Sequence, residues 1–527
     1  MKASLTGALS RRWCTYASIL LIVYGCLLAI KSVPGFPVSH NTHTRWPWLG
    51  DKPVGEDGFY MLTVADNLAH TGHLVYNYNL PVNGIQPLAT FVFAGIAYCT
   101  AHLGGDRWTL VRCVLFFGVL LFVAFAWQIA YIATDLAPSG LKSLVFQIAF
   151  FLTLFDYTAF CLFTYGLETG IYLVCIAICM KLWLRLTDAP QASWLHMLLF
   201  GAAAGLAGLA RIDFGIFTAF LLGYLFLKRI ASLPQVLAAG GVALAIVGPW
   251  FLFVHKVTGS WLPTSGKAES SLYSHGSIRI RAAIMAVLAS ICPWSYADAV
   301  SHSTTILAFL SACFILLLIW RARKSPASFR SFRRLGIFKA WLPPLIAFVL
   351  IYVIFFFSKW FYTRYFSPIL IVAIPFLAVL FAMQRFVRER PQALLLVIAL
   401  LFCLFDIPSM HSGHIVRDHL IAAGYIHENY PVERVGAFQS GAIGYFDPNV
   451  ENLDGKLNQY ALAATAANRI GDFIDSERID VLVDRPAFLI GHLPEDYRNR
   501  EWQACPQPMP ASDSMCLIRK HPFAPIP

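Results

Sequence analysis

Long apolar runs separated by short polar loops make up most of the chain up to about residue 410. A membrane-spanning helix needs roughly 20 mostly apolar residues. Runs that meet this criterion lie at 14–32, 112–134, 142–160, 168–186, 194–210, 213–228, 235–254, 303–320, 338–357, 366–384 and 391–407. Two further apolar stretches, 87–103 and 282–298, are shorter and interrupted. The pattern predicts a polytopic α-helical membrane protein.

Basic residues indicate which of the doubtful stretches cross the membrane. They gather in the short loops "KLWLR" (181–185), "LKR" (227–229), "RARKSPASFRSFRR" (321–334) and "QRFVRER" (384–390). Cytoplasmic loops carry such an excess of Lys and Arg. All four loops lie inside if the N-terminus is cytoplasmic and 87–103 lies in, or dips into, the outer interface. The same argument indicates that 282–298 does not cross the membrane. We therefore predict about 11 spans, with the N-terminus inside and the C-terminus outside.

The first apolar run, "CTYASILLIVYGCLLAI", follows the basic residues Lys2, Arg11 and Arg12. A cleaved signal peptide would have a shorter apolar core and a small-x-small cleavage site. Neither feature is present, so we expect an uncleaved first membrane helix.

Composition agrees with a membrane protein, and the charge distribution argues against nucleic-acid binding. The 527 residues are 58% hydrophobic and 13% charged, and soluble domains carry about twice that charged fraction. Mean hydropathy is +0.62. The net charge of +11 could suggest a nucleic-acid partner, but the basic residues are divided among the short loops. This distribution is typical of membrane topology.

The last part of the chain has a different composition. Residues 411–527 are mixed and polar, with strand-like runs "VERVGAF" (432–438) and "IDVLV" (479–483) and a helix-like run "ALAATAANRIGDFIDS" (461–476). These elements predict a small extracytoplasmic α/β domain at 411–527. It follows a transmembrane domain at 1–410, whose first external loop is 33–111.

Most of the 12 cysteines lie in apolar runs, where a thiol behaves as a small hydrophobic side chain. Cys505 and Cys516 lie in the polar C-terminal region. A disulfide between them is possible outside the cytoplasm, and two unpaired thiols are the alternative.

Five groups of ionisable residues gather at or just below the predicted external face. They are Glu56 and Asp57 in "VGEDGFYMLTVADNLAHTG", Glu168 in "FTYGLETGIY", Arg211 and Asp213 in "GLARIDFG", Lys267 in "GSWLPTSGKAES", and Arg364 in "SKWFYTRYFSPIL". Ionisable groups at membrane depth cost several kcal/mol, so they usually indicate function or pairing. A carboxylate can deprotonate a hydroxyl, and Arg and Lys can bind phosphate. Acids and bases together suit a lipid-linked anionic substrate.

Each group also has a structural interpretation. Glu56 and Asp57 can be a solvated loop or the first turn of a helix, where acids favour the helix dipole. Glu168 can be a structural cap or ion pair, and Arg211 can simply pair with Asp213. Arg364 can extend to the membrane interface.

Six segments in order carry a resemblance to a known family: "EDGFYMLTVADNLAHTGHLVYNYNLPVNGIQPL", "GLET", "LPTSGKA", "RYFSP", "GAIGYF" and "NLDGKLN". This order resembles the GT-C superfamily of membrane glycosyltransferases and is most similar to the bacterial terminal arabinofuranosyltransferase group. The resemblance covers nearly the whole chain. It implies inverting transfer of a sugar, arabinofuranose in the most similar group, from a polyprenyl-phosphate donor to an extracytoplasmic glycan, lipid or protein. The implied location is the bacterial inner membrane, with the active site on its extracytoplasmic face.

The resemblance also assigns roles to individual residues. Asp57 matches the general base, Glu56 beside it can share that role, and Glu168 matches a second acidic position. Candidates for the donor phosphate are Arg364, Lys267 and Arg211, and candidates for the substrate cleft are Asn83, Gln86 and Tyr365.

Two points stay open on this resemblance. Some GT-C members bind a divalent cation between such acids, so Glu56 and Asp57 are the candidate ligands for Mg²⁺, Mn²⁺ or Ca²⁺. The C-terminal domain, including Tyr460, can recognise the acceptor or can serve only as a packing lid.

A transporter or flippase of lipid-linked sugars is the main alternative function, with the acids as a proton relay. Transporters commonly show internal repeats and broken helices near the midplane. The sequence shows no internal repeat, and its acids lie at one face. A scaffold protein is a second alternative, but it gives no reason for acids and bases to converge.

Overall fold

The computed structural model describes residues 2–31, 54–77, 80–259, 261, 263–266, 268, 276–291, 302–323, 335–355, 362–401, 415–507, 509 and 512–523. Some sequence predictions lie outside these described residues. They concern Lys267, the 33–53 part of the first external loop, the 324–334 part of the third basic loop, and the domain boundary near 410.

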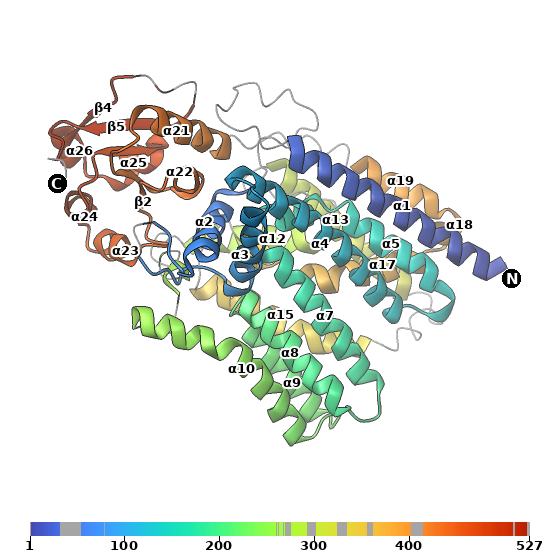
Figure 1. The fold of residues 1–527 in the computed structure, drawn as a ribbon. Coiled ribbons are helices and arrows are strands. Elements are labelled where there is room, and N and C mark those ends of the chain that lie inside the picture. Colours follow the sequence, from blue (N-terminus) through green and yellow to red (C-terminus); the bar gives the residue numbers. More distant parts are fainter. Residues whose placement is uncertain are drawn as a thin grey trace.

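A body of α-helices and a smaller mixed domain make up the described chain, and the mixed domain lies at one end of the body beside α2 and α3 (Figure 1). The body contains α1 (Lys2–Lys31), α2 (Glu56–Thr71), α3 (Pro87–His102), α4 (Arg107–Leu136), α5 (Lys142–Leu154), α6 (Tyr157–Thr164), α7 (Thr169–Asp188), α8 (Trp194–Ala210), α9 (Phe214–Leu227), α10 (Leu233–Thr258), α12 (Gly276–Ile291), α13 (His302–Arg323), α15 (Leu335–Phe355), α16 (Tyr362–Tyr365), α17 (Ile369–Met383), α18 (Arg385–Glu389) and α19 (Pro391–Leu401), with a 3₁₀ turn at Ser139–Leu141.

Several body helices are apolar enough to lie in a membrane. Within the described residues, Arg107–Leu136, Thr169–Asp188 and Leu233–Val257 are long and apolar enough to cross it by length and composition. Among the same described residues, seven other apolar helical segments are shorter, at 10–17 residues, and two of them are parts of α13 and α15. The mostly helical body therefore agrees with the predicted membrane class, and the count of eleven spans stays a prediction.

The predicted continuous span at 142–160 is wrong in one respect, because the structure divides it. The segment Ser139–Leu154 and the helix α6 are bent by 61° relative to each other, and the pair could together form a fourth span. Asp156 lies at the break, where its side chain accepts a hydrogen bond from Ala159 N (2.9 Å) and caps α6. A residue that caps a new helix adopts an extended backbone, which interrupts the preceding helix.

Close packing of α8 on α10 depends on small residues. A Cβ atom added at Gly201 would lie 2.3 Å from Ala239 O, and one at Gly205 would lie 3.0 Å from the Ala243 Cα. Glycines four residues apart on one helix face let two backbones approach closely. Arg211 follows α8 directly, and its backbone N–H donates to Ala207 O of that helix.

The C-terminal domain contains a five-stranded sheet in the order β2-β1-β3-β5-β4, so the predicted small α/β domain is confirmed as a fold. The strands are β1 (Val435–Ala437), β2 (Val450–Asn452), β3 (Val481–Asp484), β4 (Trp502–Ala504) and β5 (Met515–Arg519), of which the first three are parallel. The helices are α21 (Ile415–Asn429), α22 (Gly441–Phe446), α23 (Gln459–Ala466), α24 (Ile470–Ser476), α25 (Pro486–His492) and α26 (Glu495–Glu501).

Successive residues of the central strand β3 pack into two different apolar layers. Val481 and Val483 pack with residues of α21, whereas Leu482 between them packs with residues of α24 and α25. Successive strand residues point to opposite faces, so one strand serves both layers.

Two details of this domain differ from the sequence prediction or resolve it. The prediction of a single helix at 461–476 is wrong. The structure has two helices there, α23 and α24, which are separated at Asn468, and this residue adopts a left-handed φ of 54°. Asn is one of the few non-glycine residues that tolerate this conformation, and it ends helices for that reason. Cys505 and Cys516 form a disulfide across the β4–β5 pair, with their Cα atoms 5.5 Å apart.

Candidate active site

The C-terminal domain contacts α2 through the carboxyl ends of its parallel strands. The Tyr60 hydroxyl accepts a hydrogen bond from Ser440 N (3.1 Å) and lies 3.3 Å from both Phe438 O and Asp454 Oδ2. Tyr76 donates to Ser440 O (2.7 Å). The residues contacted on the domain follow β1 and β2. Carboxyl ends of parallel strands meet at one edge of a sheet, and here that edge binds α2.

Glu56, at the start of α2, also points into this contact. Its Oε2 lies 2.9 Å from His419 Nδ1 of α21, and its Oε1 accepts a hydrogen bond from Ala442 N (3.2 Å). Burial alone would lower the pKa of His419, but the Glu56 carboxylate outweighs burial and raises that pKa above its ordinary value. Glu56 therefore joins α2 to the C-terminal domain by a charged hydrogen bond.

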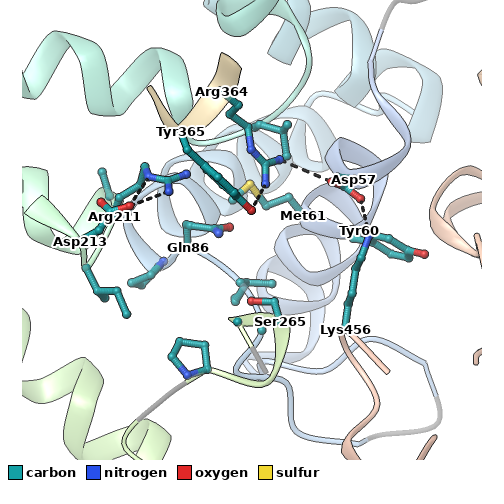
Figure 2. A pocket seen from close by; sticks show the side chains of 18 of the residues that line it. Asp57, Tyr60, Met61, Gln86, Arg211, Asp213, Ser265, Arg364, Tyr365 and Lys456 are labelled. Atoms are coloured by element: carbon teal, nitrogen blue, oxygen red, sulfur yellow. Dashed lines mark hydrogen bonds and ion pairs between the residues drawn. The ribbon is translucent and has the colours of Figure 1, made fainter. Parts of the chain in front are cut away.

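Asp57 points the other way, into a cavity of about 410 Å³ (Figure 2). Its Oδ1 lies 3.2 Å from Lys456 Nζ, and its Oδ2 lies 3.5 Å from a terminal nitrogen of Arg364. Burial disfavours the charged carboxylate, but Lys456 and Arg364 outweigh burial and lower the pKa of Asp57 below its ordinary value. The carboxylate is therefore ionised at neutral pH and held between two cations.

The cavity lies between the helical body and the C-terminal domain. Its wall includes Asp57, Tyr60 and Met61 of α2, residues 84–87 and 210–213, Pro263, Ser265 and Gly266, Tyr352, Arg364 and Tyr365, and Lys456 and Leu457. Most of this wall is apolar, and the ionised groups stand close together on it. Sites for small molecules commonly combine an apolar lining with a few placed polar groups.

A second charged cluster supports one side of the cavity. Arg211 forms ion pairs with Glu168 (2.8 Å) and Asp213 (2.6 Å), and Glu168 is fully buried. The Arg211 guanidinium also lies 4.6 Å from the centre of the Tyr365 ring, and that of Arg364 lies 5.2 Å from the same ring. The Tyr365 ring thus links the Arg211 cluster to Arg364.

The structure brings together five of the nine residues to which the resemblance assigns roles. Those that line the cavity are Asp57, Gln86, Arg211, Arg364 and Tyr365. Those that are absent from its wall are Glu56, Glu168 and Asn83. Lys267 is outside the described residues. The catalytic and binding roles of all nine remain predictions.

Lys456 is the residue that sequence reasoning missed. It lies in "NLDGKLN", a segment that carried part of the family resemblance, and it reaches Asp57 from 399 positions away in the chain. Its backbone is held by residues of two segments: the hydroxyl of Thr264, which follows α10, lies 3.0 Å from Lys456 O and 2.8 Å from Asn83 Oδ1 of the first external loop. A Cβ at Gly84 would lie 2.1 Å from Lys456 O, so this close approach requires glycine there.

The residues at the site do not fit a divalent cation. Both oxygens of Asp57 face cationic side chains, and Glu56 points away towards His419. Among the residues that the structure describes, no three His, Cys, Asp or Glu side chains cluster as metal ligands. Mg²⁺, Mn²⁺ and Ca²⁺ need several oxygen ligands, and an ammonium group beside a carboxylate repels them.

If the protein has the sugar-transfer activity that the sequence predicts, removal of divalent cations is expected to leave that activity within about twofold of its starting rate, because Lys456 and Arg364 already supply the positive charge. The measurement is the transfer rate before and after EDTA treatment. Loss of activity with EDTA, followed by recovery with Mg²⁺ or Mn²⁺ alone, would contradict the charge assignment.

Comparisons with known proteins bear on the fold. No protein-family model and no curated protein matches the chain. The crystal structure of ArnT from Cupriavidus metallidurans bound to undecaprenyl phosphate matches with a TM-score of 0.57 at 13% identity, over 95% of this chain and 97% of that one. The apo state of ArnT gives a TM-score of 0.56 over the same shares.

A second neighbour is the archaeal oligosaccharyltransferase AglB from Archaeoglobus fulgidus, in complex with an inhibitory peptide and a dolichol-phosphate. It matches with a TM-score of 0.50 at 12% identity, over 90% of this chain and 70% of that one. At such low identity the likeness concerns the fold alone. The protein therefore has a fold similar to the folds of ArnT and of the oligosaccharyltransferase AglB.

Proposed function

We propose that the protein is an inverting membrane glycosyltransferase that moves a sugar from a polyprenyl-phosphate donor to a hydroxyl group of a cell-envelope glycan, lipid or protein. One observation carries the proposal: an ionised carboxylate, Asp57, shares a cavity with Arg364 and Lys456. The fold neighbours bound to undecaprenyl phosphate and dolichol-phosphate support a lipid-linked donor.

In this mechanism the acceptor hydroxyl gives its proton to Asp57 while its oxygen attacks the anomeric carbon. The bond between that carbon and the phosphate oxygen breaks, and its electron pair leaves with the phosphate. A single displacement inverts the configuration at the anomeric carbon. The leaving group is a phosphate monoester, so cationic stabilisation by Arg364 and Lys456 replaces a strong general acid.

Glu168 has a supporting role in this proposal. It lies behind the cavity wall, fully buried and paired with Arg211. Through Arg211 and the Tyr365 ring it fixes the side of the cavity that presents Arg364. Arg211 is paired with two carboxylates, so we assign the donor phosphate to Arg364 and Lys456 first.

We also propose the predicted arrangement in the membrane. Residues 1–410 form the transmembrane domain with eleven spans, and residues 411–527 lie outside the cytoplasm. The active site then faces the extracytoplasmic side of a bacterial inner membrane. The likeness to ArnT and the apolar helices support this arrangement, and reporter fusions to the loops at 181–185 and 227–229 test it.

The function is tested with purified protein, radiolabelled polyprenyl-phosphate sugars and an extract of cell-envelope acceptors. We expect release of polyprenyl phosphate and labelled acceptor, both dependent on the acceptor. The sequence resemblance favours arabinofuranose, so arabinofuranosyl, hexosyl and other pentosyl donors are compared. A protein that only relocates intact donor across vesicle membranes is a flippase, and that result would overturn the proposal.

Loss of either phosphate-binding cation is expected to weaken donor use. Lys456→Gln and Arg364→Gln each remove a charged hydrogen bond of about 1.5–3 kcal/mol, which raises the KM for the donor or lowers kcat/KM by about 10- to 100-fold. Lys520→Gln is the matched control, since Lys520 lies on the same domain, exposed, and donates to Asn499 O. An unchanged kcat/KM in both cavity variants would remove these residues from the donor site.

A further inference from the structure

Asp57 and the donor phosphate need the same two cations. In the structure both oxygens of Asp57 face a cation, Lys456 at 3.2 Å and Arg364 at 3.5 Å. We propose that the donor phosphate displaces Asp57 from Lys456 and Arg364, so that donor binding itself converts the carboxylate into a competent base and the acceptor reacts second. This inference rests on the proposed function and specifies the order in which that site works.

Among the described residues, the two cations that contact Asp57 already have carboxylate partners. Lys456 Nζ also lies 3.8 Å from Asp454 Oδ2, so Asp57 and Asp454 balance Lys456 and Arg364. A donor phosphodiester adds a third negative charge for the same two cations. The phosphate must therefore compete with a carboxylate for its binding partners.

The neighbouring charged groups do not relieve this competition. Arg211 is held by the two carboxylates Glu168 and Asp213, and that cluster has one more acid than base. Glu56, next to Asp57 in sequence, is paired with His419 and is absent from the cavity wall. Among the described residues, the exchange thus involves Asp57, Asp454, Lys456 and Arg364, whereas Arg211, which also lines the cavity, stays with its own two carboxylates.

The contacts of Asp57 with Arg364 and Lys456 can be exchanged for contacts of these cations with a phosphate. The contact between Arg364 and Asp57 is at the long limit for a hydrogen bond, and a phosphate oxygen accepts stronger, charge-assisted bonds from a guanidinium. The backbone of Lys456 is fixed by Thr264 and Gly84, so only its flexible four-carbon side chain has to move. A phosphate that enters the cavity can therefore bind both Lys456 and Arg364 without a change in the fold.

Displacement has a chemical consequence for the base. Nearby cations favour the charged carboxylate and make it a weak proton acceptor. When the cations turn to the phosphate, the proton affinity of Asp57 rises just before an acceptor hydroxyl has to lose its proton. Asp57 is therefore a weak base in the empty site and a stronger base when the donor is bound.

Proton uptake on ligand binding tests this exchange without requiring transfer. The full-length protein in detergent is titrated calorimetrically with a short-chain prenyl methyl phosphodiester, which keeps one negative charge throughout, in two buffers of different ionisation enthalpy between about pH 3.5 and 6, since the pKa of Asp57 starts below its ordinary value. If ligand binding raises the pKa of Asp57 by one unit, the protein takes up about half a proton at the pH midway between the two pKa values. We expect an uptake of this size in the unaltered protein and its loss in Asp57→Asn.

Variants make the assignment specific. Lys456→Gln is expected to reduce the uptake, and Asp472→Asn, an exposed acid of the C-terminal domain, is expected to leave it unchanged. Binding without uptake, or an uptake that survives in Asp57→Asn and disappears in Asp454→Asn, would overturn the exchange while leaving the proposed function standing. Failure of the phosphodiester to bind at all would instead count against the donor site and the proposed function.

Discussion

Changing Asp57 to Asn is expected to reduce sugar transfer by about 10²- to 10⁴-fold, the range that a general base contributes. The amide keeps the size of the side chain but cannot accept the acceptor proton. Lys456 keeps Asp454 as a partner in the variant, so we expect normal folding and membrane insertion. The measurement is labelled transfer at saturating donor, together with the size-exclusion profile of the purified variant.

Two variants control this experiment. Asp472→Asn removes an acid at the exposed surface of the same protein, where its partner is Arg469, and should retain full transfer. Glu56→Gln is expected to retain at least about one tenth of the transfer rate, because an amide oxygen can still accept the Ala442 N hydrogen bond. Full activity of Asp57→Asn, with a collapse of Glu56→Gln, would transfer the base role to Glu56.

Changing Arg211 to Met is expected to destabilise the protein by about 3–5 kcal/mol, the cost of leaving a buried ion pair without one partner. Glu168 is fully buried, and Asp213 is only slightly exposed, so both carboxylates would lose their counter-charge in an apolar setting. Met preserves much of the side-chain volume, which limits the effect of packing. Thermal unfolding in detergent, followed by Trp fluorescence, measures the change.

An exposed ion pair gives the matched control for this prediction. Arg469 and Asp472 are 70% and 64% exposed, and Arg469→Met should change stability by no more than about 1 kcal/mol. Adding Glu168→Gln to Arg211→Met should recover part of the stability, because it removes one uncompensated charge. Equal unfolding temperatures for Arg211→Met and Arg469→Met would show that the buried cluster is not the support we infer.

The C-terminal domain has a direct part in the site under this view. It supplies Lys456, and its sheet edge holds α2 through Tyr60 and Ser440. The choice left open by the sequence was between acceptor recognition and a simple lid. The contacts favour a third role, in which the domain completes the charged cavity, and Tyr460, which is exposed, is absent from the cavity wall.

Much of the local structure was predictable from the sequence. The apolar runs correspond to helices, because a long unbroken apolar segment has few alternatives in a membrane. The strand-like run at 479–483 predicted a strand, and the polar tail predicted a separate α/β fold. The two errors, at Asp156 and Asn468, are both helix breaks that depend on one residue and leave the apolar pattern unchanged.

The site itself was predictable only in part. Charged residues at the ends of apolar runs are unusual, so the sequence indicated Asp57, Arg364 and Arg211 before their neighbours in space were known. Glu56 and Asp57 are adjacent, and successive helix residues point about 100° apart, so the sequence could tell that they diverge. It could not tell which of them faces the cavity, because that depends on where the C-terminal domain binds α2.

By itself, then, the sequence determined the membrane class, the helical body, the small α/β domain and the acids and bases available for chemistry. Only the tertiary structure decided their pairing: Asp57 with Lys456 across 399 positions, Glu56 with His419, and Glu168 with Arg211. Hydrophobic periodicity acts over a few turns of one helix and can be read locally. The partner of a buried charge is chosen by the packing of distant segments, which no local pattern records.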